Sequence, residues 1–170
     1  MGVCRWPILP GLAAALLSLP AFIRPASARE PEIARVLVEK AARRIVLFDG
    51  AGRAVRIYRG IQLGFRPTGP KRSEGDGRTP EGRYTIDYGN AASAYHLSLH
   101  ISYPDAADRA RALAGGHSPG GAIFIHGQPS FLRNGPAGGD WTAGCIAVSD
   151  KEIEELWALV PDGTPIDLVP

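Results

Sequence analysis

The stretch GDWTAGCIAVSD, residues 139–150, joins a cysteine and a preceding glycine to a short apolar run. Cys145 is one of two cysteines in the 170-residue chain, and the other, Cys4, lies near the N-terminus. The run CIAVS has the composition of a short strand, and Ser149 with Glu152 forms the capping box that begins a helix. This stretch therefore predicts a strand that starts at Cys145 and leads into a helix.

The first 28 residues have the features of a secretory signal peptide. Arg5 supplies a basic start, residues 8–23 are mostly apolar, and Ala26-Ser27-Ala28 has the form of a signal-peptidase site. A membrane anchor is the alternative, but the uninterrupted apolar run is shorter than the roughly 20 residues of a spanning helix. We expect residues 1–28 to be removed on export to the periplasm or cell envelope, with no stable membrane insertion afterwards.

Removal of this segment leaves a chain without net charge. The full sequence has 19 basic and 17 acidic residues, and Arg5 and Arg24 are the charged residues of the first 28. The remaining 17 basic and 17 acidic residues provide no electrostatic basis for binding nucleic acid. About 140 residues are enough for one domain with a hydrophobic core. We expect that domain to span residues 29–170, and composition does not indicate its oligomeric state.

Export also leaves Cys145 as the single cysteine of the chain. An odd cysteine in an exported protein indicates a reactive thiol or an intermolecular disulfide, whereas the alternative is a buried thiol that packs as a small apolar residue. Gly144, directly before it, leaves the backbone unobstructed, so N–H groups there could bind an oxyanion. Which interpretation applies depends on the residues that lie near Cys145.

Period-two apolar patterns dominate the rest of the chain and predict a mainly β single domain. Strands are expected within 35–39, 45–49, 53–64, 82–89, 94–102, 121–127, 145–149 and 161–169. A short helix is expected over 104–116, with Pro104 in its first turn, and a second over 149–160. The sequence thus predicts a β domain with one or two short helices.

His126 ends one predicted strand and Cys145 begins another, with an 18-residue loop between them. If the two strands are neighbours, the imidazole and the thiol meet at one edge of the sheet. A free thiol has a pKa of about 8.5 and is mostly protonated at neutral pH, but an adjacent histidine can accept its proton. His126 and Cys145 are therefore a candidate base and nucleophile.

Two other functions are weighed against this one. A His/His/Cys zinc site is disfavoured because His96 and His100 are four strand residues apart, about 13 Å, and cannot share one ion at about 2 Å. The loop at 64–83 is rich in glycine, proline and charge, but it lacks the order of a phosphate-binding loop and no helix follows it. We expect no metal ion, no cofactor and no phosphate site.

The sequence resembles the L,D-transpeptidase catalytic domain (YkuD-like). The dipeptide HG at 126–127, followed by TAGCIAV at 142–148, is similar to the family signature His-Gly, then [Ser/Thr]-x-Gly-Cys-[Ile/Val]-Arg. The segment RTPEG at 78–82 is similar to the family's Thr-Pro-x-Gly. The resemblance covers nearly the whole chain after residue 28, and it implies a β-sandwich-like or barrel-like domain of the bacterial cell envelope.

The resemblance also implies a role for each motif residue. Cys145 would be the nucleophile and His126 the general base, with the carbonyl of Gly127 orienting the imidazole. Thr142 and Gly144 would help Cys145 to shape the oxyanion region. The implied substrates are peptidoglycan stem peptides, and the implied reaction passes through a thioester to a new peptide cross-link.

Ala147 departs from the signature, which has arginine two residues after the cysteine. Its side chain is expected on the same face as that of Cys145, so a methyl group there predicts a wider and less charged acceptor pocket. Water would then compete as acceptor, which makes an L,D-hydrolase or amidase with the same Cys-His pair the alternative function. A binding module that keeps the fold without catalysis is a further rival.

Overall fold

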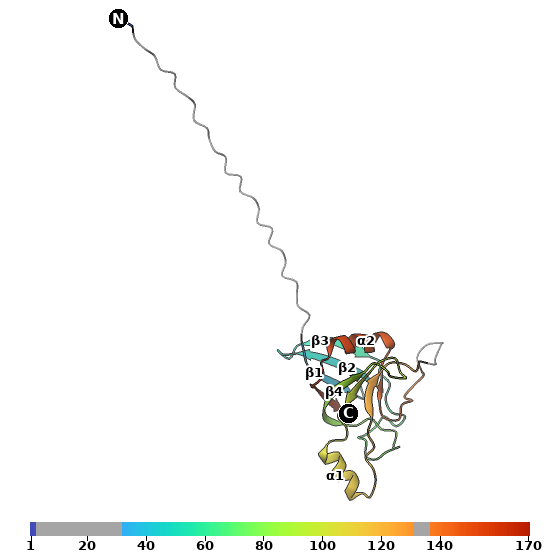
Figure 1. Ribbon diagram of the computed structural model, residues 1–170. Helices are drawn as coiled ribbons and strands as arrows, with labels where there is room; N and C mark the ends of the chain where they lie inside the picture. Colours follow the sequence, from blue (N-terminus) through green and yellow to red (C-terminus); the bar gives the residue numbers. More distant parts are fainter. Residues whose placement is uncertain (3–31, 131–136) are drawn as a thin grey trace.

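The computed structural model describes residues 1–2, 32–130 and 137–170 (Figure 1). The predicted signal peptide, residues 1–28, lies outside the described residues except for Met1 and Gly2, so its removal stays a prediction. None of the described helices is long and apolar enough to span a bilayer.

One eight-stranded sheet, in the order β3-β2-β1-β8-β4-β5-β6-β7, forms the body of the domain and confirms the mainly β prediction. The strands are β1 (Ile33–Glu39), β2 (Arg44–Asp49), β3 (Ala54–Arg59), β4 (Gly82–Asn90), β5 (Ser98–Ile101), β6 (Ile123–His126), β7 (Ile146–Ala147) and β8 (Thr164–Val169). The C-terminal β8 lies in the middle, parallel to β1 and antiparallel to β4. It therefore joins an N-terminal meander to the strands that carry the candidate site.

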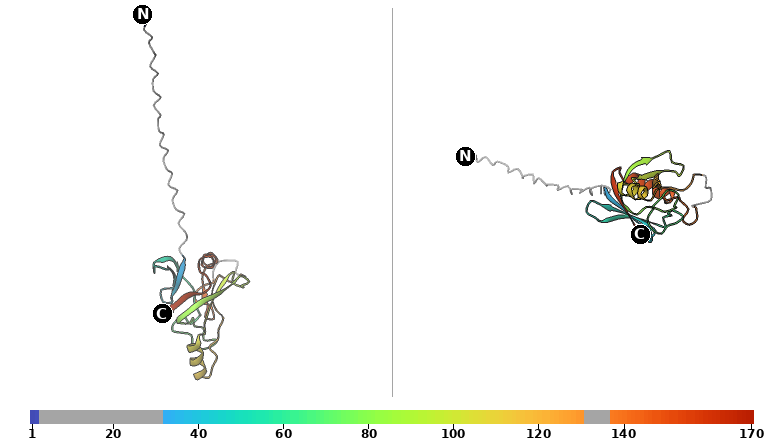
Figure 2. Two further views of the ribbon diagram at one scale, coloured as in Figure 1. Left: turned by 60° about the vertical axis from the view of Figure 1, so that its left-hand side comes forward. Right: turned by 90° about the horizontal axis from the view of Figure 1, so that it is seen from below.

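The sheet is strongly curved (Figure 2). The segment after β3 forms isolated bridges with the other end of the sheet, at Gln62–Ala147 and Gly64–Thr142. A sheet that curls on itself encloses a core between its own strands. Its fully buried side chains come from nearly every strand and from α2: Val36, Ile45, Leu47, Leu63, Ile86, Ile101, Ile125, Ile146, Ile153, Leu156, Ile166 and Leu168.

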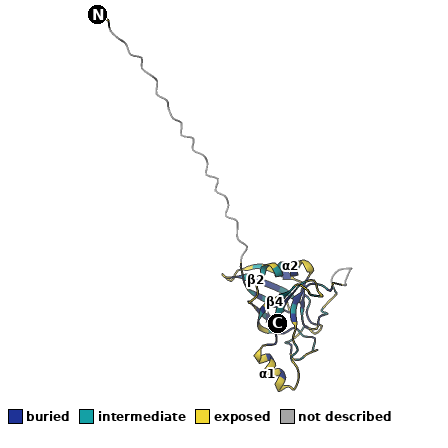
Figure 3. Cartoon of the chain, in the orientation of Figure 1, coloured by how far each residue is buried: buried dark blue, intermediate teal, exposed yellow. Residues whose placement is uncertain are grey.

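Two helices flank the sheet at opposite ends of the molecule (Figure 1). Helix α2 (Asp150–Leu159) begins at the predicted Ser149–Glu152 capping box and packs on the core through Ile153 and Leu156. Helix α1 (Ala106–Ala114) is largely exposed (Figure 3). Its N-cap is Asp105, so Pro104 precedes the helix and the prediction that it lies in the first turn is wrong.

Three predicted strands are clearly shorter in the structure, at positions where the backbone conformation changes. The strand predicted over 53–64 ends at Arg59, before Gly60 with φ of +73°. Strand β5 begins only at Ser98, after His96, whose φ of +69° interrupts an extended chain. Strand β7 holds two residues and begins at Ile146, so Cys145 lies directly before it instead of starting it. Gly144, with φ of +141°, makes the turn into this strand.

Candidate active site

Strands β6 and β7 are parallel neighbours, and this pairing brings His126 and Cys145 together. Ile125 pairs with Ile146, and His126 pairs with Ala147. By continuation of this register Cys145 lies beside Phe124, two residues before His126. Since side chains alternate between the faces of a strand, the thiol and the imidazole project from the same face. Both line one pocket of about 290 Å³.

His126 is held in one orientation and one tautomer. Its side chain is buried, with 3% of the residue exposed, and Nδ1 lies 2.7 Å from the carbonyl oxygen of Gly127. A carbonyl only accepts hydrogen bonds, so Nδ1 carries the proton and Nε2 keeps its lone pair. Burial lowers the pKa of His126, against the opposing effect of the Gly127 hydrogen bond. The resting imidazole is therefore a neutral base.

Cys145 is partly buried, and its thiol donates to the carbonyl of Ala122 at 3.5 Å. Burial raises the pKa of the thiol, while a backbone hydrogen bond from Phe124 and the charge of Lys71 oppose that increase. The pKa values of Cys145 and His126 are shifted in directions that favour a neutral thiol beside a neutral imidazole. Such a pair becomes charged only when the proton moves from sulfur to nitrogen.

Thr142 and Gly144 shape the turn that leads into Cys145. Thr142 Oγ1 accepts a hydrogen bond from the Gly144 N–H at 3.1 Å and donates one to the Cys145 carbonyl at 2.7 Å. A Cβ at Gly144 would lie 2.7 Å from the carbonyl oxygen of Arg78, so only glycine fits there. Thr142 therefore fixes the backbone at Cys145, and the Gly144 N–H is already engaged.

The RTPEG segment belongs to a loop that packs behind the cysteine. Asp76 holds this loop: its carboxylate accepts from the backbone N–H groups of Arg72, Ser73 and Arg78 and from Lys71 Nζ. Burial alone would raise the pKa of Asp76, but these hydrogen bonds outweigh it and lower the pKa to about 2. The loop thus places an ion pair between the buried Lys71 and the partly buried Asp76 near the thiol.

The pocket that holds His126 and Cys145 is lined mainly by small and aromatic side chains. Its lining consists of Asn90, Ala92, Ser93, Ala94, Tyr95, Ser98, Ala122, Phe124, His126 and Cys145. No Asp, Glu, Lys or Arg occurs among these residues. Ala122 takes the uncommon φ of +53°, which turns the chain where its carbonyl receives the thiol.

Ala147, the residue that departs from the family signature, lies beside His126 in the sheet. It is fully buried and does not line the pocket. Its register partner His126 carries two aromatic neighbours, Tyr95 at 4.5 Å and Trp141 at 5.7 Å between ring centroids. Aromatic side chains therefore occupy this side of the site, and the expectation of a wider and less charged acceptor pocket stays a prediction.

The sequence analysis does not predict that aromatic side chains surround His126. Trp141 lies four residues before Cys145, and that proximity is a signal in the sequence. Tyr95 gives no comparable signal, because it is 31 residues away from His126 and approaches it only through the loop before β5.

Two of the three remaining histidines, His96 and His100, bind different partners. His96 Nε2 lies 2.7 Å from a carboxylate oxygen of Glu154, and His100 Nδ1 lies 2.6 Å from one of Asp87. No group of three potential metal-binding residues occurs within 32–130 and 137–170. His100 instead stacks on Tyr88, 4.6 Å between ring centroids.

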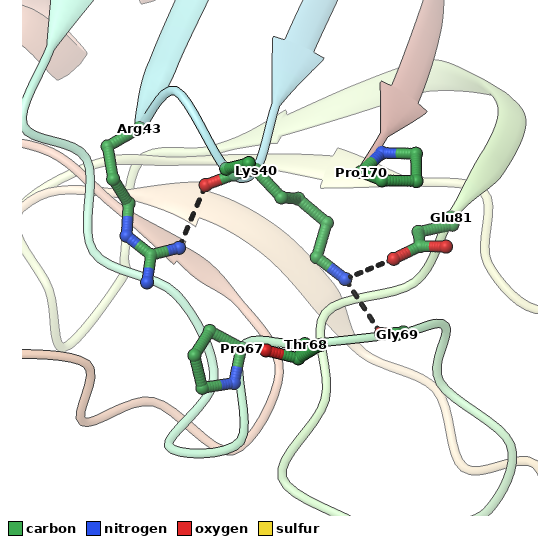
Figure 4. Close-up of a pocket in the computed structure, with 8 residues that line it drawn as sticks. Lys40, Arg43, Pro67, Thr68, Gly69, Glu81 and Pro170 are labelled. Carbon is green, nitrogen blue, oxygen red and sulfur yellow. Dashed lines mark hydrogen bonds and ion pairs between the residues drawn. The ribbon is translucent and has the colours of Figure 1, made fainter.

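A second pocket, of about 140 Å³, is lined by residues of the 64–83 loop and by the turn after β1 (Figure 4). Lys40 projects into it and is 2% exposed. Its Nζ donates to the carbonyls of Gly69 and Thr79, at 2.8 and 3.0 Å, and to Glu81 at 2.8 Å. Each of the three N–H donors of the ammonium group thus has an oxygen acceptor. Lys40 therefore anchors the loop.

Known proteins share both the fold and the sequence pattern of this domain. The Escherichia coli K12 protein YafK, whose name assigns it provisionally to the L,D-transpeptidases, is 29% identical over 94 residues, which are 54% of this chain and 32% of YafK. The helical cell shape determining protein Pgp2 of Campylobacter jejuni superposes with a TM-score of 0.65 at 25% identity, over 82% of this chain and 48% of Pgp2. An L,D-transpeptidase from Xylanimonas cellulosilytica has the same fold, with a TM-score of 0.50 at 20% identity over 83% and 62% of the two chains.

The match therefore spans about a third of YafK and half of Pgp2. The sequence profile of YkuD, the L,D-transpeptidase catalytic domain, matches residues 33–168, which is the whole curled sheet and both helices. The chain belongs to the L,D-transpeptidase (YkuD) family.

Proposed function

We propose that this domain is a cysteine-dependent L,D-transpeptidase that acts on peptidoglycan stem peptides. One observation carries the proposal. The parallel β6–β7 pair places the Cys145 thiol and the free Nε2 side of His126 in one pocket, while Gly127 holds Nδ1. Family membership supplies the substrate class, and the similarity to Pgp2 supports a role in cell-wall remodelling that affects cell shape.

The residues define the first half of the reaction. His126 Nε2 accepts the thiol proton, and Cys145 Sγ attacks the carbonyl carbon between an L-centre and a terminal D-residue. The C–N bond breaks, the leaving amine receives the proton from the imidazolium, and a thioester remains. The Cys145 N–H is the backbone donor for the developing oxyanion, because Thr142 already engages the Gly144 N–H.

The second half returns the enzyme to its starting state. An amine of a second stem peptide attacks the thioester, the new amide forms, and the sulfur recovers its proton through His126. Water can resolve the same thioester, which gives the hydrolase alternative. Both reactions use the same pocket and pair, so the acceptor distinguishes them.

The test is incubation of the purified domain with tetrapeptide muropeptides, followed by intact mass measurement and muropeptide separation. We expect an acyl-enzyme mass on Cys145 and a cross-linked product whose share rises with acceptor amine concentration. Cys145→Ala is the control; it removes the nucleophile and little volume, so its melting temperature should change by only about a few degrees. Turnover by this variant would disprove the nucleophile. Free peptide as the sole product would favour the hydrolase.

A further inference from the structure

Gln62, Ala147 and His126 lie side by side across the curled sheet. Ala147 pairs with His126 on one side and with Gln62 on the other. The Gln62 and Ala147 backbones exchange two hydrogen bonds, of 2.9 and 2.8 Å. Because residues paired in register project to the same face, the Gln62 amide and the His126 imidazole stand on either side of the Ala147 methyl group.

The Gln62 side chain uses its full hydrogen-bonding capacity on the loop that joins His126 to Cys145. It donates to the carbonyls of Ala137 and Gly139, the latter at 2.8 Å, and accepts from Gln128 Nε2 at 3.2 Å and Trp141 Nε1 at 3.1 Å. A side-chain amide has two N–H donors and two acceptor positions, so Gln62 can form no further hydrogen bond. Gln62 therefore fixes both described ends of this loop.

The indole of Trp141 reaches from Gln62 to His126. Its Nε1–H is bonded to Gln62, and its ring packs edge-on against the imidazole, 5.7 Å between centroids. Tyr95 contacts both rings, 4.5 Å from His126 and 5.9 Å from Trp141. Ala147, which pairs with both His126 and Gln62, is fully buried. The indole thus bridges the two residues that flank Ala147 and packs against one side of the imidazole.

We propose that Gln62 and Trp141 are positioning residues for His126: the Gln62 amide holds the indole, and the indole orients the imidazole and excludes water from it. The proposal rests on the proposed function, in which His126 is the base. It also explains alanine at position 147. A longer side chain there would need the volume that the indole occupies.

Two variants separate the hydrogen bond from the bulk of the indole. Trp141→Phe keeps an aromatic ring but loses the N–H, and Gln62→Leu removes its acceptor. The readout is the pH titration of the His126 ring by NMR on histidine-labelled protein, with the signal assigned by its loss in His126→Gln. We expect each single variant to raise the pKa of His126 by about half a unit, because water gains access to the ring.

The double variant tests whether the two residues act through one bond. Once Gln62→Leu has removed the acceptor, Trp141→Phe has no hydrogen bond left to break, so the double variant should titrate like Gln62→Leu alone. Trp157→Phe is the matched control, since Trp157 packs in α2 against Gly89, away from the imidazole. It should leave the titration unchanged.

The titration also needs no turnover, so it is independent of the proposed function. An unchanged His126 pKa in Trp141→Phe would overturn the inference even if Gln62→Leu did not fold, and so would additive shifts in the double variant. If either of these titration results occurred while wild-type protein formed the acyl-enzyme normally, the positioning role would be refuted and the proposed function would stand. Absence of any acyl-enzyme, with the expected titrations, would instead refute the proposed function and leave the positioning role intact.

Discussion

The pockets at Lys40 and Cys145 differ in how their polar groups are satisfied, although the 64–83 loop lines the first and packs against Gly144 beside the second. Lys40 makes three strong contacts to oxygen atoms, one of them to Glu81 (Figure 4). The Cys145 thiol donates one weak hydrogen bond, at 3.5 Å, in a pocket whose described lining has no formal charge. A buried group with all its partners stabilises the fold, whereas a nucleophile with few partners remains free to react.

The largest effect is expected at the reactive pocket. His126→Gln removes the base, so the thiol proton has no acceptor of suitable pKa, and acyl-enzyme formation should slow by about 10²- to 10⁴-fold. This rate is measured by mass spectrometry of the thioester in samples quenched at successive times. Iodoacetamide labelling of Cys145 near pH 7 should slow as well. Equal labelling rates from pH 6 to 8 would mean that His126 does not control the thiol.

The Lys40 pocket should respond in stability instead. Lys40→Met leaves Glu81 without its buried partner, and removal of one member of a buried ion pair is expected to destabilise the fold by about 3–5 kcal/mol. Chemical denaturation measures this loss. The labelling rate of Cys145 in the folded fraction should stay at the wild-type value. A large change in that rate would show that the two pockets are coupled.

A substitution at Lys71 distinguishes an effect of charge on the Cys145 thiol from an effect on the stability of the fold. Lys71 is a second buried lysine of the same kind, paired with Asp76, but its charge also lowers the pKa of the Cys145 thiol. Lys71→Met should therefore shift the pH profile of labelling upward and slow labelling at pH 7 by about two- to tenfold. Lys40→Met is its matched control. Identical pH profiles in both variants would exclude an effect of Lys71 on the thiol.

The smallest effect concerns the loop between the pockets. The pKa of Asp76 is about 2 in the folded state and 3.8 as its ordinary value, so its ionised form stabilises the fold above about pH 4. That contribution is lost as the pH falls through 2. In Asp76→Asn the melting temperature should be lower at pH 7 but fall less between pH 4 and 2. Parallel melting curves of the two proteins would contradict this assignment.

Much of the local structure follows from the sequence. Alternating apolar residues predict the strands, and Ser149 with Glu152 predicts the start of α2, because both depend on neighbours a few residues away. Cys145, His126 and Gly127 could be singled out for the same reason, since they lie within short recognisable motifs. The start of β5 cannot be predicted in the same way, because no local sequence signal indicates the left-handed conformation of His96.

The composition of the site beyond these motifs depended on tertiary structure. Strand order is set by burial of the whole sheet, and it alone makes β6 and β7 parallel neighbours and brings Gln62 to Ala147. Trp141 and Gln62 are 79 residues apart in sequence, so no periodicity or motif could indicate their hydrogen bond. The sequence by itself determined which groups can react, because that is a property of the side chains. Only the folded chain decided what surrounds them, because burial and orientation come from contacts between distant segments.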